Sequence, residues 1–191
     1  MSDYRFTFIS ILFLVSAGVS FFVAYIAWQK KSVRGAAELS RLMLASGYWA
    51  FCIIFETASP TIEGKVLWSQ ISYMGALSTP LLYAFFVFRF VGMDNFLTRT
   101  NYVLFSIIPS VVILLAWTNE LHYLVWTGFA PIDPSTNLTQ YFHGIAFWIG
   151  YVGYFYMLFA VATVYLLRFA AGHMVAFKLQ TSAIFAASLC P

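Results

Sequence analysis

The sequence predicts an all-α, multi-pass transmembrane helix bundle, and three observations lead to this fold class. Of the 191 residues, 62% are hydrophobic and 9% are charged, against about 25% charged residues in a typical soluble domain. Aromatic residues make up 20% of the chain, which is typical of helices with headgroup-level anchors. Five apolar runs are long enough to cross a hydrocarbon core of roughly 30 Å. The net charge of +3 is too small to indicate a nucleic-acid partner.

The apolar runs define the expected spans. They cover residues 8–28, 39–60, 66–88, 102–117 and 145–167, and a partial sixth run covers 179–191. The fourth run is the shortest and contains Pro109, so we expect a kink there. The sixth run would rise only about 20 Å. We therefore expect the natural chain to continue outward, to return as a seventh helix, and to reach an output domain in the cytoplasm.

The positively charged residues predict the orientation of the bundle. Eight of the ten Lys and Arg residues follow the first, third and fifth runs, seven of them in the connections and one, Arg41, at the very start of the second run. Because cytoplasmic loops are enriched in Lys and Arg, we expect these three connections inside the cell (plasma or inner) membrane and the N-terminus outside. Lys30, Lys31 and Arg34 follow the first run instead of preceding it, which favours a retained helix over a cleaved signal peptide.

The connection at 118–144, which begins "TNELHYLVW", is then expected outside. Its two prolines argue against a continuous helix, and "DPS" at 133–135 indicates a turn. Disordered loops are poor in aromatic residues, whereas this one is rich in them. We therefore expect it to fold onto the outer mouth of the bundle. The sequence "NLT" at 137–139 matches a glycosylation sequon, which is a weak motif.

Glu56 is the one carboxylate expected inside a span. It lies four residues before Pro60, about 6 Å from the outer end of its helix. Ionisable groups within a membrane are costly and often functional. The alternative is an interfacial Glu that extends to water, and both interpretations stay open at this point.

Tyr73 belongs to a stripe on the third run, in which residues 69, 73, 76 and 80 share one helical face. Small and polar residues on such a face permit close helix approach and hydrogen bonds between helices. Tyr73 is placed to donate to Glu56 if the two lie at equal depth. Ordinary packing is the alternative.

His122 and Trp126 complete the set of candidate residues. His122 and His143 bracket the outer loop, but no tight ligand spacing such as His-x-x-x-His is present. We therefore expect His122 to tie the loop to Trp126 and to hold no metal. The hypothesis is that Glu56, Tyr73, His122 and Trp126 border one outward-facing ligand cavity. GxGxxG, P-loop, GxSxG and HExxH motifs are absent, so no catalytic residue or cofactor is predicted.

A series of short motifs runs along nearly the whole chain. The series is a basic first inner loop, Arg41, Trp49-Ala50 and Glu56, then Trp68 and Tyr73-x-Gly75-x-x-x-x-Pro80, then Thr118-Asn119-x-x-His122-x-x-x-Trp126, and finally Gly144 with Phe147-Trp148. Together they resemble the N-terminal seven-transmembrane region of microbial sensor histidine kinases. The chain departs from that pattern where it ends, with helix 6 incomplete and helix 7 missing.

The resemblance implies a membrane-embedded input domain that detects an extracellular or intramembrane signal and relays it to a cytoplasmic histidine kinase. It further implies a lipid bilayer around the domain, a small signal ligand, a homodimer, and an output domain in the same parent chain. The alternative is a small-molecule transporter or channel subunit. A transporter is expected to have broken helices in two repeats, and only Pro80 and Pro109 interrupt the runs.

Overall fold

The computed structural model describes residues 3–172. Their long helices are α1 (Phe8–Gln29), α2 (Ala36–Ala58), α3 (Ile62–Phe90), α4 (Arg99–Trp117) and α5 (Tyr154–Gly172), and a π-helix, η3 (Phe147–Gly153), leads directly into α5. With η3 and α5 taken as one, five helices of this part of the chain are long and apolar enough to cross a membrane. The predicted all-α, multi-pass bundle is confirmed.

The helices differ from the predicted spans mainly at their first turns. α3 begins at Ile62 instead of residue 66, because the Thr61 side chain accepts a hydrogen bond from the Gly64 N–H at 3.1 Å and caps the helix. Thr98 caps α4 in the same way, so that helix begins at Arg99. Polar residues that were assigned to loops therefore form helical turns. The partial sixth run, 179–191, lies outside the described residues.

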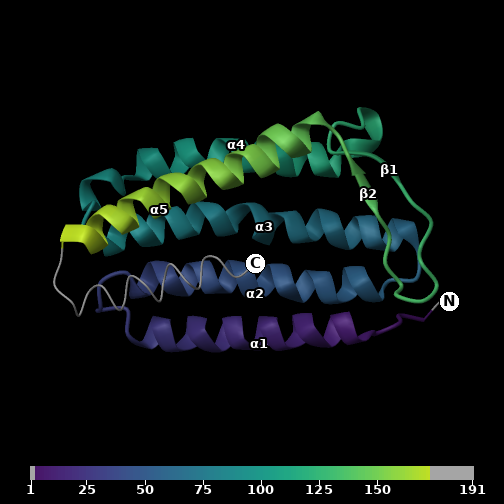
Figure 1. The fold of residues 1–191 in the computed structure, drawn as a ribbon, viewed down its shortest axis with the longest axis horizontal. Coiled ribbons are helices and arrows are strands. Elements are labelled where there is room, and N and C mark those ends of the chain that lie inside the picture. The colour runs from purple at the N-terminus through teal and green to yellow at the C-terminus, as the bar shows by residue number, and fades with distance from the viewer. Residues whose placement is uncertain (1–2, 173–191) are drawn as a thin grey trace.

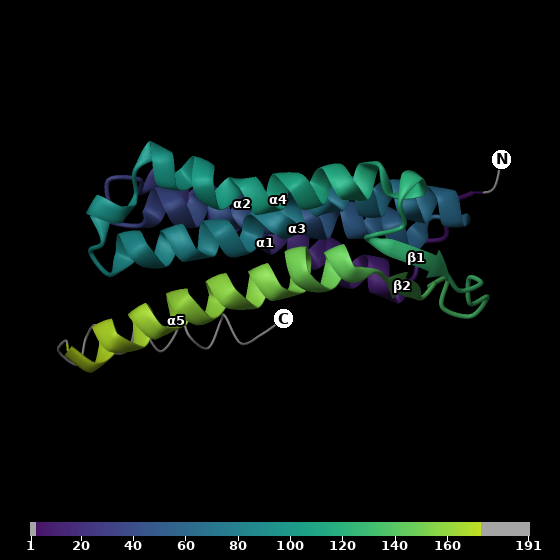
Figure 2. The ribbon, with the colours of Figure 1, turned by 90° about the horizontal axis from the view of Figure 1, so that it is seen from above.

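α3 is the central helix of the bundle. α1, α2 and α3 lie side by side in chain order, and α4 and α5 lie on the other side of α3 (Figure 1). From above, α5 runs obliquely to the other helices (Figure 2). Of the 18 most hydrophobic consecutive residues in each helix, 72% are buried inside the protein in α3, against 17% in α1 and in α4. α3 is therefore packed on several sides, whereas α1 and α4 present most of their apolar surface outward.

Gly75 sets the close approach of α2 and α3. A Cβ at this position would lie 2.9 Å from both the Ala45 carbonyl oxygen and the Trp49 backbone nitrogen. Small residues allow two helix backbones to approach in this way. All four members of the predicted stripe on α3, residues 69, 73, 76 and 80, are buried.

The two ends of the bundle differ in chemistry. At one end, which we name the arginine end, the α1–α2 connection meets the segment that follows α3. There Arg34 donates from Nε to the Arg89 carbonyl oxygen at 2.7 Å and pairs with Asp94. Arg89 pairs with Asp94 at 2.5 Å and with Glu38 at 3.2 Å. α1 begins at the opposite end (Figure 1).

That opposite end carries a small β-hairpin, so we name it the hairpin end. The connection at 118–144 contains a short 3-10 helix, η2 (Asn119–Leu121), and two antiparallel strands, β1 (Trp126–Phe129) and β2 (Tyr141–His143). A loop was expected over this connection, and its two strands were not predicted from the sequence. Strands of three and four residues are too short to give a clear alternating pattern.

Candidate functional site

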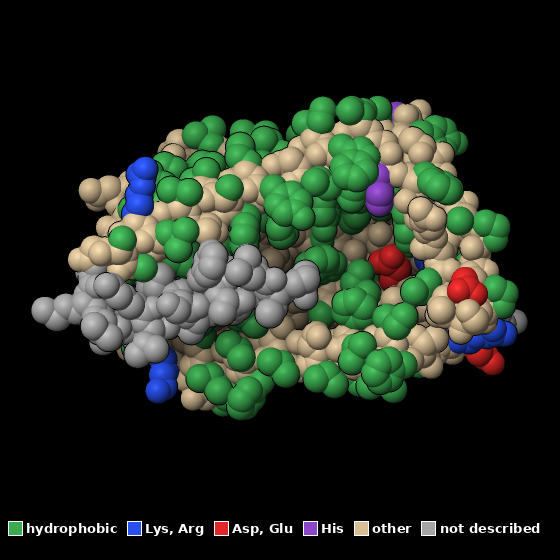
Figure 3. Space-filling model, viewed as in Figure 1, with side chains coloured by type: hydrophobic (Ala, Val, Ile, Leu, Met, Phe, Trp, Pro, Cys, Tyr) green, Lys and Arg blue, Asp and Glu red, His purple; other side chains and the backbone are tan. Residues whose placement is uncertain are grey.

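The hairpin end is hollowed on the face shown in Figure 3. An acidic side chain is visible inside the hollow, and a histidine lies at its edge. Segments from both halves of the chain meet at this end, namely the last turn of α2, the first half of α3, the β-hairpin and η3. The hollow therefore lies where the predicted site residues are expected.

Glu56 lies two residues before the end of α2. Its side chain is half-buried, and its Oε2 is fully buried without a hydrogen-bond partner among the described residues. None of the ion pairs found within residues 3–172 includes Glu56. A buried polar atom without a partner costs free energy and calls for an explanation. This oxygen is therefore not extended to water, and a ligand-binding role for Glu56 stays a prediction.

Tyr73 and Trp126 pack against each other at the centre of the hairpin end. Their ring centroids are 5.2 Å apart and the rings meet edge to face at 70°. Trp126 is 1% exposed and Tyr73 is 5% exposed. The Tyr73 hydroxyl has no hydrogen-bond partner in the described part of the chain, so the hypothesised bond to Glu56 is not formed. The Glu56 carboxylate nevertheless lies within electrostatic range of that hydroxyl.

Asn119 holds Trp126 in place through the backbone. Its Oδ1 accepts hydrogen bonds from the N–H groups of Val125 and Trp126, both at 3.0 Å, and its Nδ2 donates to the Trp126 carbonyl oxygen at 2.9 Å. Asn119 is 6% exposed. In the sequence, Asn119 stood out only as part of a motif. Its placement two residues after the end of α4, where the chain must turn, is the signal that pointed to such a role.

His122 closes a local turn of the loop. Its Nε2 is bonded to the Thr118 hydroxyl at 3.1 Å, and its Nδ1 accepts from the Leu124 N–H at 3.0 Å. Both ring nitrogens are therefore used within a few residues of His122. Of the four predicted residues, the structure brings Glu56, Tyr73 and Trp126 together and uses His122 elsewhere.

His143 is the histidine that joins the aromatic group. Its ring stacks on Phe147 with centroids 3.6 Å apart. Its Nδ1 is buried without a partner among the described residues, and burial lowers the pKa of His143. The neighbouring Tyr141 hydroxyl also lacks a partner there. Burial, and then the charge of Glu56, raise the pKa of Tyr141.

Lys65 and Asn137 dock the tip of the loop onto the end of α2. Lys65 is 2% exposed and donates from Nζ to the carbonyl oxygens of Glu56 at 3.0 Å, Thr57 at 3.3 Å and Asn137 at 2.6 Å. The Asn137 amide donates to the carbonyl oxygens of Thr57 at 2.8 Å and Ser59 at 3.2 Å. These bonds satisfy carbonyl groups that the end of a helix leaves free.

This docking contact was not predicted from the sequence, in which Asn137 stood out only as part of a sequon. A lysine soon after a helix end is positioned to bond the last carbonyl groups of that helix. The contact with Asn137 had no comparable signal, since the two residues are 72 positions apart.

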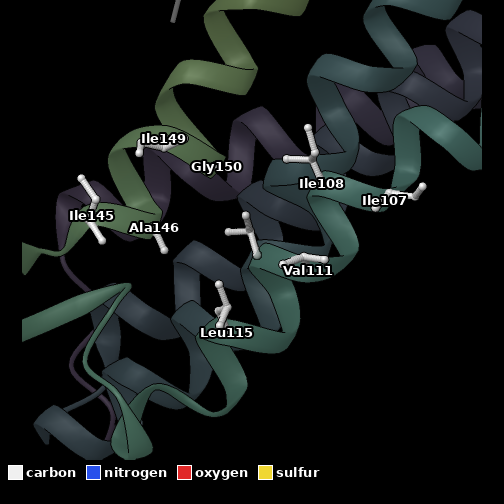
Figure 4. Close-up of a pocket in the computed structure, with 9 residues that line it drawn as sticks. Ile107, Ile108, Val111, Leu115, Ile145, Ala146, Ile149 and Gly150 are labelled. Atoms are coloured by element: carbon white, nitrogen blue, oxygen red, sulfur yellow. The ribbon is translucent and has the colours of Figure 1, made fainter.

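A second cavity, of about 300 Å³, lies between α4 and the start of η3 (Figure 4). Its lining consists of Ile, Val, Leu, Ala and Gly residues from 107–115 and 145–150. At Gly150 a Cβ would clash with the Val112 side chain, so the glycine permits the close approach beside the cavity. This lining offers no side chain that can orient a polar ligand.

Together the fold and the site define a multi-pass helical membrane protein with an aromatic, partly polar site at one end. A family model described as the N-terminal 7TM region of histidine kinase matches residues 12–191. The chain therefore belongs to this family, and the resemblance drawn from its motifs is confirmed. No curated protein and no solved structure matches the chain.

Proposed function

We propose that this chain detects a small signal ligand at the hairpin end and relays its presence to a cytoplasmic histidine kinase or similar output domain. The observation that carries the proposal is the grouping of Glu56, Tyr73 and Trp126 beneath a docked loop, with buried polar atoms that lack partners among the described residues. Convergent polar groups within an aromatic site are typical of small-molecule binding. Membership of a histidine kinase input family supports the relay.

The proposal places the hairpin end outside the cell membrane and the N-terminus with it. Arg34 and Arg89 gather at the opposite end, and Lys and Arg concentrate on the cytoplasmic side of membrane proteins. Reporter fusions test this orientation. Fusions after Gly35 and Asn95 are expected to report the cytoplasm, and a fusion after Pro134 is expected to report the outside. A cytoplasmic signal at Pro134 would overturn the orientation.

α3 is the element that can carry the signal along the bundle. It holds Tyr73 near the hairpin end and Arg89 in its last turn, about 24 Å apart at 1.5 Å per residue. Arg89 in turn pairs with Glu38 on α2 and with Asp94 beyond α3. A ligand that displaces Tyr73 therefore acts on the helix that these ion pairs hold. We further propose a homodimer, in which this displacement alters the relation of two output domains.

The test uses the full-length parent protein and its response to its own signal. Alanine at Glu56, Tyr73 or Trp126 is expected to reduce that response at least tenfold while the protein still inserts into the membrane. Glu63→Ala and Tyr25→Ala are the matched controls, because both residues are exposed, and these variants are expected to respond normally. Normal responses from all three site variants would refute the proposal. Solute uptake by vesicles, without any change in output, would favour a transporter instead.

A further inference from the structure

Six aromatic rings form a closed circuit at the hairpin end, each in contact with the next. In order, they belong to Tyr73, Trp126, Tyr141, His143, Phe147 and Tyr151, and the circuit closes from Tyr151 back to Tyr73. Neighbouring centroids are 3.6 to 6.5 Å apart. We name this set the aromatic circuit. α3, β1, β2 and η3 each contribute to it, so the folded bundle brings the rings together.

Polar atoms without partners accompany the aromatic circuit. The hydroxyls of Tyr73 and Tyr141, Nδ1 of His143 and Oε2 of Glu56 are all buried and unpartnered among residues 3–172. The Glu56 carboxylate lies within electrostatic range of the Tyr73, Tyr141 and Tyr151 hydroxyls. The Glu56 carboxylate and the Tyr141 hydroxyl lie close enough to interact with each other, so a ligand beside these rings meets one carboxylate and two tyrosine oxygens.

The charges around the site favour a cation. Lys65 is the cation whose charge acts on Glu56, but its Nζ already donates to three carbonyl oxygens, and an ammonium has three donors. It therefore has no further donor for the carboxylate or for an anionic ligand. An anion would also be repelled by Glu56. A neutral alcohol would bring no positive charge to the carboxylate, which Lys65 reaches only through its charge and not through a hydrogen bond.

We propose that the aromatic circuit and Glu56 bind the primary ammonium group of a small organic amine. The faces of aromatic rings attract cations, more strongly where water is excluded. The three N–H donors of a primary ammonium match three oxygens beside the rings, which are Glu56 Oε2 and the hydroxyls of Tyr73 and Tyr141. The inference rests on the proposed sensory function, because it names the ligand class of the same site.

The experiment measures the unfolding temperature of the purified full-length protein in lipid nanodiscs, against increasing n-butylammonium. Ligands that bind only the folded state stabilise it by mass action, so a saturable rise is expected. 1-Butanol and butyrate match the probe in chain length, and neither is expected to cause such a rise. Tetramethylammonium, which has no N–H donor, is expected to bind at least fivefold more weakly. An equal effect of butanol, butyrate or tetramethylammonium would overturn the proposal.

Variants locate the binding to this site. Glu56→Gln is expected to weaken n-butylammonium binding at least tenfold, and Glu63→Gln, at an exposed position of the same end, is expected to leave it unchanged. Phe147→Leu keeps an apolar side chain but removes a ring face, and a threefold or greater loss is expected. If Glu56→Gln fails to fold, Phe147→Leu still tests whether the amine binds at the aromatic circuit. Equal affinity of Phe147→Leu and the parent protein would count against the aromatic circuit.

The same measurements separate failure of this inference from failure of the proposed function. One outcome is that n-butylammonium does not bind, while alanine at Glu56 or Tyr73 still abolishes the response to the natural signal. This outcome overturns the amine as the ligand class but leaves the proposed sensory function standing. Specific amine binding that leaves kinase output unchanged, together with normal signalling by the alanine variants, supports the amine site and overturns its sensory role.

Discussion

Lys65 donates a hydrogen bond from Nζ to the Asn137 carbonyl oxygen across 2.6 Å, although 72 positions separate the two residues in the sequence. The same ammonium holds two carbonyl groups at the end of α2. One side chain from α3 therefore fastens the long loop to the neighbouring helix, directly beside Glu56.

Lys65→Met is expected to release the tip of the loop. Methionine fits the apolar part of the lysine but removes the lysine donor from three carbonyl oxygens, and only that of Thr57 keeps another donor, the Asn137 amide. Buried unsatisfied groups are costly. Amide hydrogen exchange across 131–139 is expected to accelerate at least tenfold. Lys31→Met is the control, since Lys31 lies at the arginine end and its ammonium is 5.1 Å from the centroid of the Trp28 ring. Unchanged exchange at 131–139 would show that other contacts hold the loop.

Asn119→Ala is expected to destabilise the protein by about 3 kcal/mol, because two backbone N–H groups and one carbonyl lose their buried partner. Denaturant unfolding in detergent, followed by tryptophan fluorescence, measures the change. Thr127→Ala removes a single exposed hydrogen bond in the same hairpin, 3.2 Å to the Phe142 carbonyl oxygen. We expect that control to stay within about 0.5 kcal/mol of the parent protein. Similar losses in both variants would contradict the special role of Asn119.

The membrane helices were predictable because apolar run length alone identifies them, whereas their ends depend on caps. Thr61 and Thr98 each add a first turn that hydropathy does not detect. The β-hairpin was missed because β1 and β2 contain four and three residues. Long-range pairing, which a single sequence does not reveal, decides such short elements.

Glu56, Tyr73 and Trp126 could be grouped from the sequence because helical counting places the first two near one end of the bundle and the long loop that contains Trp126 follows the helix that ends there. His122 and His143 lie near opposite ends of the loop, so sequence position alone could not show which of the two histidines joins the site. The register of the β-hairpin places His143 in the site, because it pairs Trp126 with His143. That the grouped residues bind a ligand stays a prediction.

Gly75→Ala is expected to destabilise the bundle by about 1–3 kcal/mol, the usual cost of overpacking. The new Cβ meets rigid backbone of α2 at 2.9 Å, so α2 and α3 must separate. Gly18→Ala is the matched control, because nothing lies within 4 Å of the added Cβ. It is expected to be neutral or to stabilise the helix by up to about 1 kcal/mol. Equal unfolding temperatures for the two variants would contradict the close contact.

Asp94→Asn is expected to lower stability at neutral pH but not in acid. The hydrogen bond from Arg89 holds the pKa of Asp94 below its usual range. A carboxyl whose pKa is lower in the folded state contributes stability above its unfolded pKa of about 3.9, and that contribution is lost as the pH falls through the folded value. The unfolding temperatures of parent and variant should therefore differ at pH 7 and converge below about pH 3. A constant difference would exclude titration of Asp94 as the cause.

The buried amide of Asn137 has a consequence for the choice of expression host. Its nitrogen donates to the carbonyl oxygens of Thr57 and Ser59, and this nitrogen is the atom that an oligosaccharyltransferase modifies. A eukaryotic secretory pathway attaches glycans during translocation, before the loop can dock. A sugar on Asn137 would then keep Lys65 and the end of α2 from closing against it. Material made in such a host should separate into a docked, unglycosylated species and a glycosylated species with an open hairpin end, whereas a host without this modification should yield only the first.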